Sequence, residues 1–161
     1  RLGQYIRMSI GKTPPRGETK YWTNGKYPWV SISDMSDYGL VTTTKESVSE
    51  CARNLFGKIS PAGTLIMSFK LTVGRTSLLN VSAYHNEAII SIYPFVDKNY
   101  QARNYLFHIL PIISNLGDSK DAIKGKTLNS KSLNNLLLPL PPLKEQGRIV
   151  AMIELLFDKL K

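Results

Sequence analysis

The feature that most constrains the fold lies near the end of the sequence, where an apolar segment meets a pair of prolines. Residues 136–140 read Leu-Leu-Leu-Pro-Leu and are followed by Pro141 and Pro142. Proline lacks a backbone N–H and fixes φ, so it cannot continue a sheet ladder or a helix interior, but it suits the first turn of a helix. We therefore predict a strand that ends at the prolines and a helix that begins after them.

The residues after the prolines have the spacing of an amphipathic helix. Glu145 falls in the expected first turn, where free N–H groups favour a carboxylate. Apolar residues then recur three and four positions apart and predict one apolar face. This apolar stripe consists of Ile149, Val150, Ile153, Leu156, Phe157 and Leu160.

Two arrangements would bury the apolar stripe. The helix could fold back on its own domain, or it could pair with a second long helix as in a coiled coil. Leaving all of these side chains in water would forgo on the order of 10 kcal/mol, so one of the two is needed. The narrow, heptad-like spacing favours pairing with a second helix.

Composition indicates one folded domain with an anionic partner. The chain has 161 residues, 42% of them apolar, which is enough to bury a single core. A formal net charge of +9 attracts polyanions, and nucleic acid is the first candidate. A single cysteine, Cys51, excludes an internal disulfide or a cysteine zinc cluster and fits a cytoplasmic location. No apolar segment approaches the length of a membrane span.

The rest of the chain alternates short strand patterns with turns and predicts an α+β fold. We expect a small, twisted, mostly antiparallel sheet domain with packing helices, followed by a C-terminal helix of coiled-coil type. Helical spacing around Leu106 and Leu110 predicts a packing helix that Pro111 would kink or split. Strand patterns cover 27–32, 41–44, 64–69, 76–81 and 86–93, and a brief helix is expected within 47–54.

A second group of motif residues lies near the start of the chain, in the order Gly-x-Thr-Pro, Tyr-Trp and Pro-Trp-Val-Ser-x-x-Asp. These are Gly11 to Pro14, Tyr21-Trp22 and Pro28 to Asp34. Together with Pro139 to Gln146 and Arg148 to Val150, they resemble the specificity subunits of type I restriction-modification systems over nearly the whole chain. Gly147 departs from that pattern, because the family usually has a long polar residue there.

The resemblance implies a DNA target recognition domain at residues 1–142 and the start of a long spacer or dimerisation helix at 143–161. In this family two such domains, held apart by antiparallel helices, read the two halves of a split DNA site. Methyltransferase subunits modify an adenine in that site, and motor and nuclease subunits carry out restriction. The second target recognition domain would lie in the same chain or in a second copy. The resemblance implies no catalysis and no cofactor for this chain itself.

The residues offer no assembled catalytic or cofactor site. His85 and His108 are remote in sequence and belong to different expected elements. His85 and Glu87 are two metal ligands without a third, so we predict no metal site. The segment 125–127 matches only the tail of a phosphate-binding loop, since Lys120 stands where its first glycine is required.

Binding of duplex DNA requires cations for phosphates and polar groups for base edges. Three polar loops could supply them, at 11–26, 70–75 and 118–129. The candidate cations are Lys12, Arg16, Lys20, Lys26, Lys70, Arg75, Lys124 and Lys126. The candidate base readers are Asn24, Thr72, Arg75, Thr127 and Asn129, with Thr13 and Trp22 beside them in the first loop.

Two other functions fit the same charge. A basic module for single-stranded DNA or RNA would use exposed aromatic rings such as Trp22, and competition between duplex and single-stranded DNA would distinguish it. An unrecognised DNA-modifying enzyme would show turnover on DNA with magnesium or S-adenosylmethionine.

Overall fold

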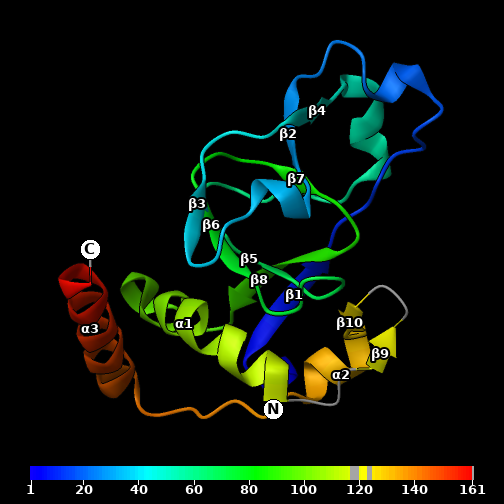
Figure 1. Cartoon of the computed structure of the whole chain (residues 1–161). Helices are drawn as coiled ribbons and strands as arrows, with labels where there is room; N and C mark the ends of the chain where they lie inside the picture. Colours follow the sequence, from blue (N-terminus) through cyan, green and yellow to red (C-terminus); the bar gives the residue numbers. More distant parts are fainter. Residues whose placement is uncertain (117–119, 123–124, 161) are drawn as a thin grey trace.

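The computed structural model describes residues 1–116, 120–122 and 125–160. Its centre is a five-stranded sheet in the order β1-β8-β5-β6-β3 (Figure 1). Neighbouring strands are antiparallel except for β3 and β6, which are parallel. The strands are β1 (Ile6–Ile10), β8 (Ile89–Pro94), β5 (Leu65–Ser68), β6 (Thr76–Leu79) and β3 (Gly39–Val41). The predicted α+β class and the predominance of antiparallel pairing are confirmed.

The two middle strands carry the core on both faces. All four residues of β5 and the first four of β8 are buried, as expected for continuous apolar segments inside a sheet. One face packs beneath the first long helix through Met67 and Ile90, and the other packs on Val30 and Val41. The strand predicted from Asn86 begins only at Ile89, because residues 86–88 form a turn.

A smaller three-stranded sheet forms a second layer, at the top of Figure 1, in the order β4-β2-β7. It covers an aromatic cluster that includes Trp29 and Tyr84. Its strands are β4 (Glu46–Val48), β2 (Tyr27–Val30) and β7 (Tyr84–His85). The short 3-10 helices are η1 (Leu2–Gln4), η2 (Thr19–Tyr21), η3 (Ile32–Asp34), η4 (Glu50–Leu55) and η5 (Lys98–Tyr100). The hairpin of β9 (Lys120–Ala122) and β10 (Gly125–Thr127) stands apart.

The packing helix α1 (Gln101–Leu116) is continuous through Pro111 and is not split. A proline at this position leaves the carbonyl of Phe107, four residues earlier, without its helical donor. The hydroxyl of Thr76 in β6 donates to that carbonyl at 2.9 Å. The sheet therefore replaces the missing hydrogen bond, and the helix continues.

The predicted strand at 136–140 is wrong. After α2 (Ser130–Asn135) the chain is extended through Pro142 but pairs with no strand. Isolated hydrogen bonds hold it instead, including Tyr105 Oη to the Pro139 carbonyl at 2.8 Å and Gln146 Nε2 to the Pro141 carbonyl at 2.9 Å. The prolines remove the N–H groups that a ladder needs, so side chains take over the carbonyls.

The helix α3 (Leu143–Lys159) begins directly after Pro142, as predicted. It packs beside α1, at the left of Figure 1, so it folds back on its own domain. Its contacts reach Phe157, whose ring centroid lies 5.9 Å from that of Tyr38 and 6.3 Å from that of His108. This divides the apolar stripe. Val150 is 7% exposed, and Ile149 and Ile153 are half-buried, whereas Leu156, Phe157 and Leu160 are exposed. The exposed Leu156 and Leu160 continue into Met152 and Leu155, and we call these four residues the outer face of α3.

None of the helices in the described part of the chain combines the length and the hydropathy that crossing a membrane would require.

Candidate nucleic-acid interface

Three loops leave the same end of the central sheet. The strands β1 and β5 finish at this end, while β8, β6 and β3 start there. It therefore carries loop 11–26 after β1, the turn 69–75 between β5 and β6, and the connection 86–88 before β8. Segments far apart in the sequence are brought together by the register of the strands.

Backbone hydrogen bonds join these loops into one row. The Lys12 N–H donates to the His85 carbonyl at 2.9 Å, and the Phe69 N–H donates to the Ala88 carbonyl at 2.9 Å. The Leu128 N–H then donates to the Phe69 carbonyl at 2.8 Å, which attaches the end of the β9–β10 hairpin. We call residues 11–16, 86–88, 69–72 and 128 the loop row. Figure 1 shows loop 11–26 and the hairpin on the same side of the molecule, at the right.

The close contact at Gly11 explains why a glycine opens the motif of the first loop. A Cβ atom at Gly11 would lie 2.0 Å from the carbonyl oxygen of His85, which no larger residue could tolerate. The chain can therefore leave β1 and pass directly over the His85 backbone. This places Lys12 and Thr13 at the start of the loop row.

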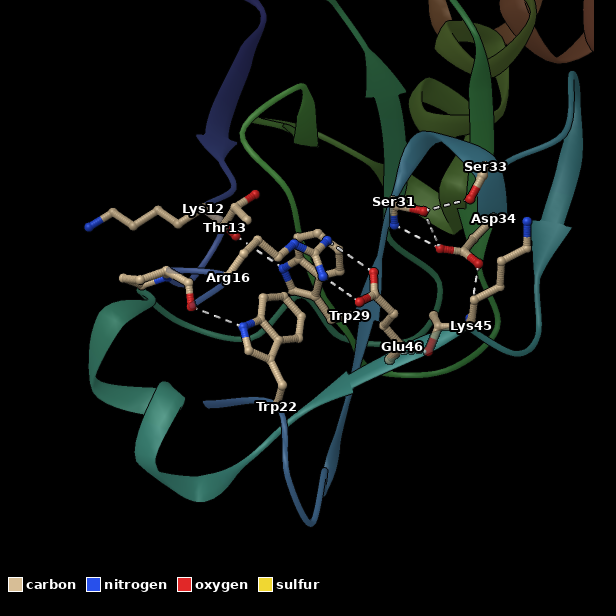
Figure 2. Close-up of polar contacts among 12 residues, drawn as sticks. Lys12, Thr13, Arg16, Trp22, Trp29, Ser31, Ser33, Asp34, Lys45 and Glu46 are labelled. Atoms are coloured by element: carbon tan, nitrogen blue, oxygen red, sulfur yellow. Dashed lines mark hydrogen bonds and ion pairs between the residues drawn. The ribbon is translucent and has the colours of Figure 1, made fainter. Parts of the chain in front are cut away.

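Two lysines and one carboxylate follow one another along the loop row. The side chain of Lys12 is exposed and extends away from its neighbours in Figure 2. Lys70 places its Nζ 5.3 Å from the centroid of the Phe69 ring. Between them Glu87 accepts a hydrogen bond from the Thr13 hydroxyl. The loop row therefore combines cations that suit phosphates with an acceptor that suits a base edge.

The charge of Glu87 is stabilised by its surroundings. Partial burial raises the pKa of this carboxyl, but the Thr13 hydrogen bond and the nearby charges of Lys70 and Arg16 outweigh burial. The pKa of Glu87 therefore lies below its usual value, and the group is ionised at neutral pH. The sequence alone does not mark Glu87 as a candidate contact to DNA bases. Its place between basic loops is the only signal that could have indicated it.

Arg16 and the two motif tryptophans form a packed cluster (Figure 2). The guanidinium lies 4.1 Å from the ring centroid of Trp22 and 4.9 Å from that of Trp29. It also donates two hydrogen bonds to Glu46, one of them at 3.0 Å, and this raises the pKa of Arg16. Each indole N–H donates to a backbone carbonyl of the loop, of Pro15 and Lys12 respectively. These residues hold loop 11–26 in shape, and the arginine charge already has a partner.

The last residue of the same motif is also structural. The carboxylate of Asp34 accepts hydrogen bonds from the Ser31 N–H at 2.8 Å and from the Lys45 N–H at 3.0 Å. It thereby caps η3 and fastens the segment before β4 (Figure 2). The motif that carries the family resemblance thus builds the scaffold of the first loop.

The remaining predicted contacts of the first loop lie outside the loop row. Lys20 and Lys26 are exposed and form ion pairs with Glu18 at 2.6 Å and Glu50 at 3.9 Å. Asn24 is exposed with φ 54°, a left-handed conformation that asparagine tolerates. These residues belong to the part of the loop that packs on η4, and they remain predictions.

In the other two loops, the predicted DNA contacts also have different surroundings. In the turn 69–75, Thr72 is exposed, whereas Arg75 donates from Nε to Asp37 at 3.0 Å beside β3. Asn129 caps α2 and accepts from the Ser132 N–H at 2.9 Å, so its oxygen is not available to a base. Lys126 and Thr127 belong to β10, and Lys124 lies outside the described residues.

The histidines are part of the packing. His85 is buried, with Nε2 at 2.7 Å from the Ser91 hydroxyl, and burial lowers its pKa to about 4. Its ring therefore faces the interior, while Glu87 faces Thr13. His108 lies on α1 and is buried where this helix meets α3, near Phe157. Burial lowers the pKa of His108 as well. Within the described ranges, acidic, histidine and cysteine side chains form no group of three that could hold a metal ion.

Comparison with known proteins identifies relatives of the whole chain. It is 27% identical over 163 aligned residues to the type I restriction enzyme EcoR124I/EcoR124II specificity subunit of Escherichia coli, covering 95% of this chain and 39% of that protein. It superposes on the crystal structure of the HsdS subunit from Thermoanaerobacter tengcongensis with a TM-score of 0.68 at 23% identity, covering 99% of this chain and 37% of that one.

A second solved structure, reported for complex assembly and conformational transition of the type I R-M system, gives a TM-score of 0.70 at 23% identity and covers 99% of this chain and 37% of that one. The chain thus spans less than two-fifths of the length of these proteins. The family described as Type I restriction modification DNA specificity domain matches residues 1–161. The fold, the motif residues and this match agree, and the chain belongs to the family of type I restriction-modification DNA specificity domains.

Proposed function

We propose that this chain recognises a specific sequence of double-stranded DNA as one half of a type I specificity subunit. The observation that carries the proposal is the loop row, which gathers basic and polar loops from three parts of the sequence at one end of a rigid sheet. A duplex needs such an arrangement, because its phosphates and base edges must be met together.

The residues of the loop row have distinct proposed roles. Lys12 and Lys70 contact phosphates and position the duplex, because their ammonium groups form no ion pair with the described residues. Glu87 and Thr72 face base edges, where a carboxylate accepts from the amino group of cytosine. Lys126 and Thr127 in β10 add contacts from the hairpin.

The proposed assembly follows the family. Residues 1–142 form the target recognition domain, and 143–161 begin the spacer helix, whose outer face pairs with a second helix in the same chain or in a second copy. Methyltransferase subunits then methylate adenine, motor and nuclease subunits cleave, and this chain catalyses neither step in the cytoplasm. The relatives' description as specificity subunits supports this division of labour.

Single-stranded nucleic acid is the weaker alternative. Trp22 would be the stacking platform, but its ring already packs against Arg16 and lies perpendicular to the Trp29 ring at 5.2 Å between centroids. Its N–H is also bonded to Pro15, so the side chain supports the loop.

The deciding experiment is selection from a randomised duplex library with the methyltransferase subunit present. We expect enrichment of one short sequence, and a single-stranded competitor should not displace it. Glu87→Gln should change the preferred base at one position of that sequence, because an amide presents a donor as well as an acceptor. Lys159→Ala, on α3, is the matched control and should select the same sequence as the wild type. Failure to enrich any sequence, or displacement by single strands, would refute the proposal.

A further inference from the structure

A second surface lies at the opposite end of the central sheet from the loop row. There β1 begins and β8 finishes, since Ile6 pairs with Pro94. The residues that follow β8 and the extended segment before α3 meet at this end and line an apolar pocket of about 380 Å³ that is open to solvent. Its lining consists of Tyr5, Val96, Leu140, Pro141, Pro142, Leu143 and Gln146.

The rim of this pocket exposes large apolar side chains. Val96 is 62% exposed and Leu140 is 50% exposed, and Phe95 beside Val96 is exposed as well. Scattered apolar residues are ordinary on a surface, but several around one pocket indicate a contact with another molecule. We call Phe95, Val96 and Leu140, with the pocket between them, the junction patch.

One residue near the junction patch, Tyr100, is held in an unfavourable backbone conformation. Asn99 and Tyr100 have φ values of 51° and 59°, in the left-handed region that a tyrosine rarely adopts. Arg103 covers the Tyr100 ring at 4.0 Å, while its own N–H donates to the Asp97 carboxylate at 3.1 Å. Strain of this kind persists where the surrounding structure enforces it, often at sites of binding.

The charges around the junction patch select the kind of partner. Lys98 and Lys144 flank it, both are exposed, and neither forms an ion pair with a described residue. The carboxylates nearby are engaged, Asp97 by the Arg103 N–H and Glu145 by the Arg148 guanidinium at 2.8 Å. A fitting partner therefore presents a large apolar side chain with carboxylates beside it.

We propose that the junction patch docks a protein segment of this chemistry from the methyltransferase subunit. The inference rests on the proposed function, because that function requires a methyltransferase partner. The position supports it, since a protein bound at this end of the sheet leaves the loop row open to DNA. An apolar pocket with exposed aliphatic rims suits a protein anchor and not a phosphate backbone.

The test is the affinity of this chain for the methyltransferase subunit encoded with it, measured by calorimetry without DNA. Val96→Glu and Leu140→Glu should each weaken that affinity by about tenfold or more, because each puts a charge into the apolar wall that would receive the partner's side chain. Lys98→Glu should weaken it less and make it less sensitive to salt. The matched control is Ile112→Glu, which replaces a 54% exposed apolar side chain on α1 and should bind as the wild type does.

Duplex binding of the same variants separates this inference from the proposed function. Val96→Glu and Leu140→Glu should bind DNA as the wild type does, because the loop row is untouched. Unchanged affinity for the methyltransferase subunit in both variants would overturn the docking surface while leaving DNA recognition standing. Concentration-dependent self-association that these variants abolish would also overturn it, because the patch would then join two copies of this chain. Loss of duplex binding in the wild type would instead refute the proposed function.

Discussion

At the residue scale, one buried side chain supports the start of the loop row. His85 is hydrogen-bonded to Ser91 at 2.7 Å, and Ser91 is 2.6 Å from the Ser60 hydroxyl, which also accepts from Tyr93. The carbonyl of His85 in turn holds the Lys12 N–H. The neutral ring is thus part of a buried polar chain that connects the core to the first proposed DNA contact.

This network makes the stability of the fold depend on pH. Burial lowers the pKa of His85 from 6.5 to about 4, so as pH falls the unfolded chain takes up the proton first. The free energy of unfolding should therefore fall between pH 6.5 and 4, by on the order of 3 kcal/mol, and this contribution should level off below pH 4. Urea unfolding across that range measures it. His85→Gln should remove the His85 part of this slope and leave only the part due to His108, whose pKa burial also lowers. An equal slope in the variant would contradict the assignment.

Residue types in the sequence predicted which loops are polar. They did not predict which polar side chains lack a partner within the protein and could therefore bind DNA. Arg16 was a candidate phosphate contact, yet its partner Glu46 lies 30 residues further along and only the fold brings them together. Asn129 was a candidate base reader, but it caps a short helix that the sequence did not predict. Hydrogen-bond partners of this kind depend on tertiary structure, so the sequence could not assign these roles.

At the scale of elements, local sequence signals predicted a helix or strand correctly where its own residues determine it. They failed where the element forms only by pairing with another element. The start of α3 was predicted correctly, because the Pro141–Pro142 pair and Glu145 act within one turn. The strand at 136–140 was wrong, because a strand exists only beside another strand. The apolar stripe was placed correctly on a helix, but which residues faced α1 depended on the position of α1.

The two sides of α3 should respond differently to substitution. Leu155→Glu combined with Leu156→Glu changes only the outer face, so the free energy of unfolding should stay within about 0.5 kcal/mol of the wild type. Helix pairing should nevertheless be lost, because two charges would enter an apolar seam. Sedimentation over a concentration series measures pairing between copies, and urea unfolding measures stability.

Val150→Ala is the matched change on the inner side of α3. It removes buried methyl groups against the domain and should cost about 2 kcal/mol of stability without changing pairing. Pairing that survives both glutamates would show that the outer face is not the seam.

At the scale of the whole molecule, the two proposed binding surfaces lie apart along one sheet. The loop row and the junction patch lie at opposite ends of β1 and β8, so DNA and a protein partner can bind without competing. The family resemblance predicted the correct fold from few residues because those residues have structural roles. Gly11, Trp29 and Asp34 shape the first loop. Side chains proposed to read bases, such as Glu87 and Thr72, have no such structural role to fix their type, so motif residues alone could not select them.

The salt dependence of duplex binding tests the loop row as a unit. If about six cations contact phosphates, counterion release should give a slope near −5 for log affinity against log salt concentration. Lys12→Ala and Lys70→Ala should each reduce that slope by about one and weaken all duplexes alike, because phosphate contacts carry no sequence information. Lys159→Ala removes an equal charge from α3, far along the chain from the loops, and should leave the slope unchanged. A wild-type slope near zero, or equal losses in all three variants, would mean that net charge attracts DNA without a defined binding surface.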